Sequence, residues 1–108
     1  MHGIAVRVPT PTVSLVDLTV NLKQTVSSEE INSALKEASE NGSLKGILGV
    51  TDLPLVSVDF KGDSRSSIVD LSETVTMENM AKVLAWYDNE WGYSCRVVDL
   101  VAYMASKK

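Results

Sequence analysis

The sequence contains only one cysteine, Cys95, and one histidine, His2, among its 108 residues. One cysteine cannot form an internal disulfide, and this pair provides no ligand spacing for zinc. A cysteine nucleophile needs a nearby base or positive charge to hold it as a thiolate, and His2 lies at the far end of the chain. We therefore expect no metal site and no catalytic residue, and we interpret Cys95 as an ordinary helix residue of an intracellular protein.

Long apolar runs and clustered positive charge are also absent. No segment approaches the roughly 20 apolar residues that a membrane span requires, and the N-terminus does not resemble a signal peptide. The 10 Lys and Arg residues are scattered against 14 Asp and Glu residues, for a net charge of −4. The glycines of "NGSLKGILG" match neither the Walker nor the dinucleotide spacing. We expect one soluble domain, residues 1–108, that binds neither nucleic acid nor membrane.

Several segments alternate apolar and polar residues, as half-buried strands do. The clearest is "VSLVDLTVNL", residues 13–22, and an earlier run over residues 3–8 stops at Pro9, which cannot donate to a ladder. Shorter strands are predicted at 46–50, 55–60 and 67–71.

Two helices are predicted from capping and spacing. Ser27 with Glu30 three residues later forms a capping box, which predicts a helix over about 28–40 that stops at Gly42. A second helix over about 89–106 is predicted from an apolar stripe at helical spacing, formed by Tyr93, Val97, Leu100, Val101 and Met104.

The segment "MENMAKVLAWYD" fits either a helix or a strand, and propensity alone favours a helix over residues 77–82. Because the predicted strands outnumber the helices and mostly follow one another directly, we expect an α+β fold. Its sheet is mixed and largely antiparallel, with both predicted helices packed on one face.

Two groups of polar residues have alternative explanations. Arg7 lies within an apolar run, where it either pairs with Asp17 across the sheet or offers its guanidinium to a phosphate or carboxylate. Asp88, Asn89 and Glu90 precede the second helix, and any of them can cap its free N–H groups. Capping does not explain the aromatic residues on both sides of Asn89.

Three segments together resemble the C-terminal part of phosphorylating glyceraldehyde-3-phosphate dehydrogenase. They are "GIAVRVPTPTVSLVDLTV", "KGILGVTDLPLVSVDFKGDSRSSIVD" and "AWYDNEWGYSCRVVDLVAYMASK", and the resemblance runs from about Gly3 to Lys107. It implies part of a catalytic domain whose mixed sheet carries helices on one face and a tetramer interface on the other. It also implies that "KVLAWYD" is a strand leading into the last helix.

The resemblance implies specific roles for four residues. Arg7 of "RVPTP" corresponds to the arginine that binds substrate or inorganic phosphate, and Asn89 of "WYDNE" to the asparagine that binds the nicotinamide carboxamide of NAD or NADP. Tyr87 and Tyr93 correspond to tyrosines of the pocket wall. Thr12 departs from the pattern, because many members of the family have asparagine there.

The resemblance also implies what the chain does not contain: the nucleotide-binding domain and the segment with the catalytic cysteine and histidine. We therefore expect a distal fragment of a glycolytic or photosynthetic oxidoreductase, which is inactive and binds NAD or NADP weakly on its own. Its expected partners are the remaining polypeptide and further copies in a homo-oligomer, in the cytoplasm or in plastids. The alternatives are a non-catalytic self-association module and a fragment of the related erythrose-4-phosphate dehydrogenase.

Overall fold

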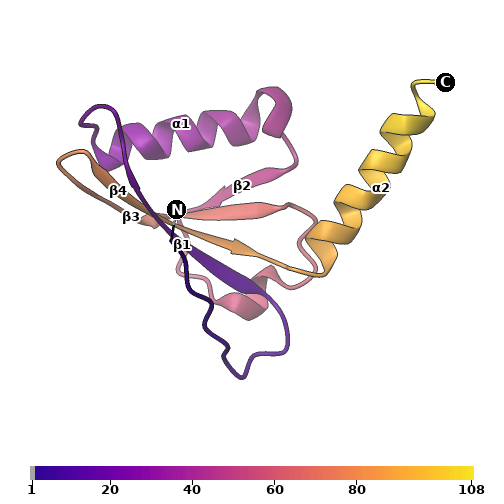
Figure 1. Cartoon of the computed structure of the whole chain (residues 1–108), viewed down its shortest axis with the longest axis horizontal. Coiled ribbons are helices and arrows are strands. Elements are labelled where there is room, and N and C mark those ends of the chain that lie inside the picture. Colours follow the sequence, from indigo (N-terminus) through magenta and orange to yellow (C-terminus); the bar gives the residue numbers. More distant parts are fainter. Residues whose placement is uncertain (1) are drawn as a thin grey trace.

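A four-stranded mixed sheet forms the centre of the computed structural model, which describes residues 2–108 (Figure 1). The strand order is β1–β4–β3–β2. β4 (Met80–Tyr87) pairs antiparallel with both β1 (Ser14–Asn21) and β3 (Ser67–Met77), whereas β2 (Leu48–Thr51) pairs parallel with β3. The predicted α+β fold with a mixed, largely antiparallel sheet is confirmed.

The hairpin between β3 and β4 shows that the segment "MENMAKVLAWYD", which fits either a helix or a strand by its sequence, forms a turn followed by a strand. Met77 pairs with Met80, and the chain reverses through Glu78, which has a φ of 55°, and Asn79. Hairpin turns of two residues require such left-handed backbone conformations. The helix that propensity favours over 77–82 is therefore wrong, and the strand implied by the resemblance is confirmed. Pairing on both sides of β4 outweighs a weak local preference for helix.

Helix α1 (Ser28–Glu40) covers part of one face of the sheet and packs against β2 and β3. Its capping box forms as predicted, with the N–H of Glu30 donating to Ser27 Oγ at 3.2 Å and the N–H of Ser27 donating to Glu30 Oε2 at 2.7 Å. The helix ends before Gly42, whose φ is 76°, and a short 3₁₀ helix, η1 (Gly42–Leu44), follows. The predicted bounds of this helix are confirmed.

A small apolar core lies beside the sheet, near the start of β1. Ile68 of β3 is completely buried, Val13 and Phe60 are nearly so, and Leu55 and Trp86 pack against them. The rings of Phe60 and Trp86 stack with their centroids 5.5 Å apart. This core supports the end of β4, directly before the residues predicted to form the site.

Phe60 reaches the core from a 3₁₀ helix, η2 (Ser57–Phe60), and the strand predicted over 55–60 is wrong. The N–H of Val56 donates to Asp59 Oδ2 at 2.8 Å, which closes a local turn. Short polar side chains that bond to the nearby backbone compete with strand pairing in this way.

The strand predicted over residues 3–8 is also absent: this segment pairs with no strand among residues 2–108, and Ile4 is 94% exposed. Apolar alternation forms a strand only where a neighbouring strand satisfies its backbone. Of the two explanations for Arg7, the ion pair with Asp17 is not observed: Asp17 Oδ2 contacts Lys82 Nζ at 2.7 Å on the neighbouring strand.

Helix α2 (Trp91–Ala105) is slightly shorter than the predicted helix over 89–106. Figure 1 shows that it runs away from the sheet, and only α1 makes extensive contact with the strands. The packing of this helix on the sheet face is therefore not observed, and most of its apolar side chains are exposed, including Val98, Val101 and Met104. Neither helix of the described chain is long and apolar enough to cross a membrane.

Candidate functional site

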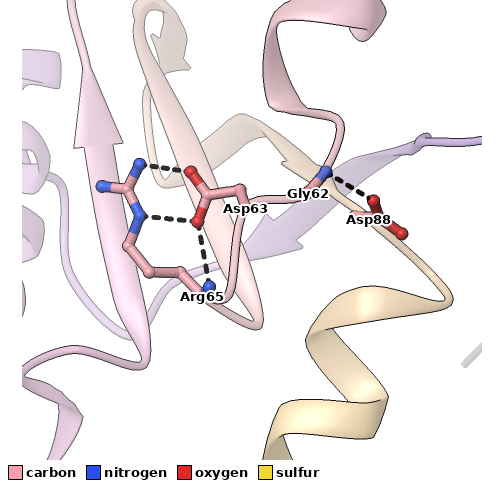
Figure 2. A network of polar contacts seen from close by, with 4 residues as sticks. All are labelled: Gly62, Asp63, Arg65 and Asp88. Carbon is pink, nitrogen blue, oxygen red and sulfur yellow. Dashed lines mark hydrogen bonds and ion pairs between the residues drawn. The ribbon is translucent and has the colours of Figure 1, made fainter.

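The junction between β4 and α2 is organised around the buried carboxylate of Asp88, which is 5% exposed. Its Oδ1 accepts the N–H groups of Glu90 at 3.0 Å and Trp91 at 2.9 Å, at the start of α2. Its Oδ2 accepts the N–H of Gly62 at 2.8 Å, from the segment before β3 (Figure 2). Of the three candidate caps, Asp88 is therefore the one that accepts hydrogen bonds from the N–H groups at the start of the helix. It also connects the helix to a loop that is distant in sequence.

These hydrogen bonds stabilise the charged form of Asp88. The N–H of Trp91 contributes most to lowering its pKa, followed by the N–H of Gly62, while burial opposes them and the N–H of Glu90 and the hydroxyl of Thr12 contribute less. A carboxylate that accepts several backbone N–H groups keeps its charge to lower pH than an exposed one. Asp88 is therefore ionised at neutral pH.

The lowered pKa of Asp88 predicts how stability changes with pH. A group whose pKa is lower in the folded state stabilises that state above its unfolded pKa, near 4 for aspartate, and loses this contribution as pH falls through the folded value. We expect the loss of unfolding free energy in Asp88→Asn to be largest near neutral pH and smaller near about pH 3. Urea unfolding of both chains at the two pH values measures it, and an equal loss at both would contradict the prediction.

The segment between η2 and β3, residues 61–66, is held by an ion pair within it; we call it the 61–66 loop. Asp63 accepts two hydrogen bonds from the guanidinium of Arg65, at 2.9 and 2.6 Å, and a third from its backbone N–H at 2.9 Å (Figure 2). The pairing lowers the pKa of Asp63 and raises that of Arg65. The Arg65 side chain lies against Gly49 of β2, and a Cβ added at Gly49 would force that side chain to move. The loop therefore contacts the edge strand of the sheet.

The first turn of α2 rests on this loop. Gly92 is buried, and a Cβ added to it would lie 3.0 Å from the carbonyl oxygen of Arg65. One turn further along the helix, Arg96 Nη1 donates to Ser66 Oγ at 3.2 Å. Together with the bond from Gly62 to Asp88, these contacts fix the start of α2 although the rest of the helix leaves the sheet.

A cavity of about 270 Å³ opens at this junction. It brings together three of the four predicted site residues, Tyr87, Asn89 and Tyr93, and its remaining lining residues are Ser66, Asp88, Gly92 and Arg96. Ser66 and Arg96 were not predicted from the sequence. Arg96 follows Tyr93 by three residues, which places both on one helix face, and this spacing is the signal that could have indicated it.

The side-chain amide of Asn89 is exposed and almost uncommitted. Among residues 2–108 its one side-chain hydrogen bond comes from Ser14 Oγ, at 3.5 Å from Asn89 Oδ1. The amide therefore presents a donor and an acceptor in one plane to whatever enters the cavity.

Arg7 lies apart from these residues in the exposed N-terminal segment. It lines neither the cavity at Asn89 nor a second cavity of about 360 Å³, whose lining is Thr12, Lys61, Gly62, Asp88, Glu90, Trp91 and Ser94. Asp88 is thus part of the wall of both cavities. The structure brings Tyr87, Asn89 and Tyr93 together but does not join Arg7 to them.

The groups at the cavity suit binding more than bond breaking. Cys95 lies on α2 with intermediate exposure, as predicted for an ordinary helix residue, and His2 is exposed near the N-terminus. What the cavity offers is an amide, two phenol rings and a guanidinium on a fixed backbone. Such a set can orient a flat polar ligand.

The sequence model of the family described as "Glyceraldehyde 3-phosphate dehydrogenase, C-terminal domain" matches residues 1–89 of this chain. The chain therefore belongs to that family, which confirms the resemblance seen in its sequence.

Named relatives extend this match through α2. The chain is 59% identical over 108 residues to glyceraldehyde-3-phosphate dehydrogenase 1 of Bacillus subtilis, covering 99% of the chain and 32% of the relative. It is 56% identical over 108 residues to the chloroplastic enzyme A of Chlamydomonas reinhardtii, covering 99% and 29% respectively. It is 57% identical over 107 residues to the cytosolic enzyme of Ginkgo biloba, covering 98% and 31%. The chain thus spans about a third of the length of these relatives.

Proposed function

We propose that this chain is the C-terminal part of a phosphorylating glyceraldehyde-3-phosphate dehydrogenase, in which it orients the nicotinamide of NAD or NADP and binds phosphate. The observation that carries the proposal is the cavity at the β4–α2 junction. In a chain that belongs to this family, Asn89, whose amide is exposed, lines one cavity together with Tyr87 and Tyr93.

Asn89 suits the role of holding the cofactor ring. The nicotinamide carboxamide has one carbonyl acceptor and one N–H₂ donor group in a plane, and an asparagine side chain has the complementary pair, whereas an aspartate lacks the donor. The cofactor supplies the ring carbon that accepts a hydride from the substrate. The neighbouring phenol rings of Tyr87 and Tyr93 offer flat apolar surface that can pack against a bound ring and limit its rotation.

Arg7 suits the role of binding phosphate. Among the interactions of residues 2–108, its guanidinium has no hydrogen bond or ion pair, and Asp17 pairs with Lys82 instead. An uncommitted guanidinium can bind a phosphate group through two parallel N–H bonds.

In this proposal, the groups that carry out the chemical steps belong to a part of the enzyme outside this chain. The thiol that attacks the aldehyde and its base belong to the two thirds of the relatives' length that this chain does not span. The 108-residue chain alone is then inactive and binds NAD or NADP weakly. Its partners are that remaining polypeptide and further copies in a homo-oligomer. The cytosolic and chloroplastic names of two relatives support the cytoplasm or a plastid as its location.

The test is a chimera in which residues 1–108 replace the matching third of the Bacillus subtilis relative. We expect phosphate-dependent formation of NADH or NADPH from glyceraldehyde 3-phosphate. Because a hydrogen bond to a charged group is worth about 1.5–3 kcal/mol, Arg7→Ala is expected to raise the KM for phosphate or substrate roughly tenfold or more. Lys23→Ala, which removes another exposed cation, is the control for charge alone.

A folded but inactive chimera, beside an active Bacillus subtilis parent, would contradict the proposal. It would favour a second candidate function, a non-catalytic self-association module, for which the exposed apolar side chains of α2 are the supporting observation. Faster turnover of erythrose 4-phosphate than of glyceraldehyde 3-phosphate would instead assign the chain to the related erythrose-4-phosphate enzyme.

A further inference from the structure

The direction of the Asn89 amide is not set by contacts of its own side chain. That side chain is exposed, and its one hydrogen bond within residues 2–108 is the 3.5 Å contact from Ser14 Oγ. Asn89 lies between the last residue of β4 and the first turn of α2, so its backbone belongs neither to the sheet nor to the helix. The position of the amide therefore depends on what holds the backbone on either side of it.

Asp88 holds that backbone. Its carboxylate accepts the N–H of Glu90 and the N–H of Trp91, the two residues that follow Asn89, so the chain closes tightly around it. The same carboxylate accepts the N–H of Gly62 at 2.8 Å from the 61–66 loop. Asp88 is buried, and its two oxygens satisfy three backbone donors, so its own position is strongly determined.

The 61–66 loop connects this junction to the sheet. The Asp63–Arg65 ion pair shapes the loop, and the Arg65 side chain lies against Gly49 of β2. The carbonyl of Arg65 contacts the buried Gly92 on the other side. Figure 2 shows the Asp63–Arg65 ion pair on one side of the loop and the contact of Gly62 with Asp88 on the other. The backbone of Asn89 is therefore held in two ways. It is covalently linked to β4, and through Asp88 and the 61–66 loop it is also connected to the edge of the sheet.

We propose that Asp88 is a positioning residue for Asn89: by joining the start of α2 to the 61–66 loop, it sets the direction in which the Asn89 amide meets the nicotinamide carboxamide. This inference rests on the proposed function. Asp88 acts through Asn89 and takes no part in the chemistry itself. Without a fixed direction of the amide, the nicotinamide ring can be misplaced or can bind turned over, with its opposite face toward the substrate.

Asp88→Asn separates the two tasks of the carboxylate. Asparagine caps helices as well as aspartate does, so its oxygen can still accept the N–H groups of Glu90 and Trp91. Its N–H₂ group then replaces Oδ2 and faces the N–H of Gly62, which puts two donors together. The variant therefore keeps the helix cap and loses the tether to the loop.

The experiment uses the chimera described above, with Asp88→Asn, Asn89→Ala and a control. Glu30→Gln is the control, because Glu30 is also a carboxylate that caps a helix, but on α1. The readouts are kcat, the KM values for cofactor and phosphate, and the face of the nicotinamide that receives deuterium from an aldehyde deuterated at C1. NMR of the reduced cofactor gives this face directly.

We expect Asp88→Asn to lower kcat roughly tenfold, to raise the KM for the cofactor, and to deliver part of the deuterium to the opposite face. The KM for phosphate and all values for Glu30→Gln should stay unchanged. A purely structural role for Asp88 would lower the melting temperature without mixing the two faces. A folded Asp88→Asn chimera with unchanged kcat, cofactor KM and face selectivity would overturn the proposal.

Two further variants distinguish a failure of the positioning role from a failure of the proposed function. An Asn89→Ala chimera with full activity would refute the proposed function, whereas a strong effect of Asn89→Ala beside none of Asp88→Asn would refute only the positioning role. If Asp88→Asn does not fold, Arg65→Ala replaces it. This change removes the ion pair with Asp63 that shapes the 61–66 loop and so loosens the contact of Gly62 with Asp88, while Arg65 lines neither cavity. Loss of face selectivity in Arg65→Ala would support the proposal, and retained selectivity would overturn it.

Discussion

Replacing Asn89 with alanine is expected to lower kcat of the chimera on the order of 100-fold, because the nicotinamide ring loses the group that fixes its orientation. Asn89 is exposed and makes a single long hydrogen bond, so the free energy of unfolding should change by no more than about 0.5 kcal/mol. Steady-state kinetics and urea unfolding of the same preparation measure both quantities. The combination of lost turnover and retained stability is the expected result.

Asn89→Asp makes the comparison sharper. Aspartate has nearly the same shape but no N–H donor, so it can no longer bond to the carbonyl of the carboxamide. We expect turnover to fall about as far as in Asn89→Ala, that is on the order of 100-fold. Asn21→Ala is the matched control, because Asn21 is an exposed asparagine on β1 outside the cavity. Retained turnover in Asn89→Asp would show that shape alone matters and would contradict the assigned hydrogen bonds.

Replacing Ile68 with alanine is expected to cost about 2–5 kcal/mol of the unfolding free energy of the chain. Ile68 is completely buried in one cluster with Val13 and Phe60, and its partner on β4 is Trp86. Because domains of this size are stable by only about 5–15 kcal/mol, a loss in this range removes a large share of the unfolding free energy. Urea unfolding followed by circular dichroism measures the change.

Ile4→Ala is the control for that experiment. It removes the same atoms from a side chain that is 94% exposed, so its effect should stay within about 0.5 kcal/mol. Similar costs for the two variants would show that residues 2–12 contribute to the core in solution. That result would contradict the arrangement seen here.

Local signals in the sequence are sufficient for segments whose cap or apolar pattern runs uninterrupted along their whole length. The capping box of Ser27 and Glu30 gave the bounds of α1, and period-two alternation placed β1 to within a residue at each end. The last helix was placed to within two residues because its apolar stripe is long. The resemblance, and not the residue pattern, indicated that β4 is a strand.

The wrong predictions concern segments whose structure depends on a partner. Residues 3–8 alternate as a strand should, but no strand among residues 2–108 lies beside them. Asp59 turns the alternating run before Phe60 into a 3₁₀ helix by bonding to the N–H of Val56. The apolar stripe on α2 indicates that this helix is amphipathic, but it does not indicate which surface the stripe packs against.

The candidate site could be predicted only in part, because some of its contacts join residues that are far apart in sequence. Asn89, Tyr87 and Tyr93 are close in sequence, so their proximity follows from the chain itself. The contribution of the 61–66 loop depends on hydrogen bonds between residues far apart in sequence, such as Gly62 to Asp88. From the sequence alone, that loop is only a polar turn.

The position of β4 in the sheet has a consequence for how the chain folds as it is synthesised. β1 lies at an edge, and its one neighbour is β4, so residues 14–21 leave the ribosome long before residues 80–87 exist to pair with them. The parallel pair of β2 and β3, with α1 beside it, is complete earlier. Contacts between distant residues form slowly because a long loop must close first. Of the four described strands, the one that comes first along the chain is therefore the last to join the sheet, and until then its backbone N–H and C=O groups are available to pair with other nascent chains.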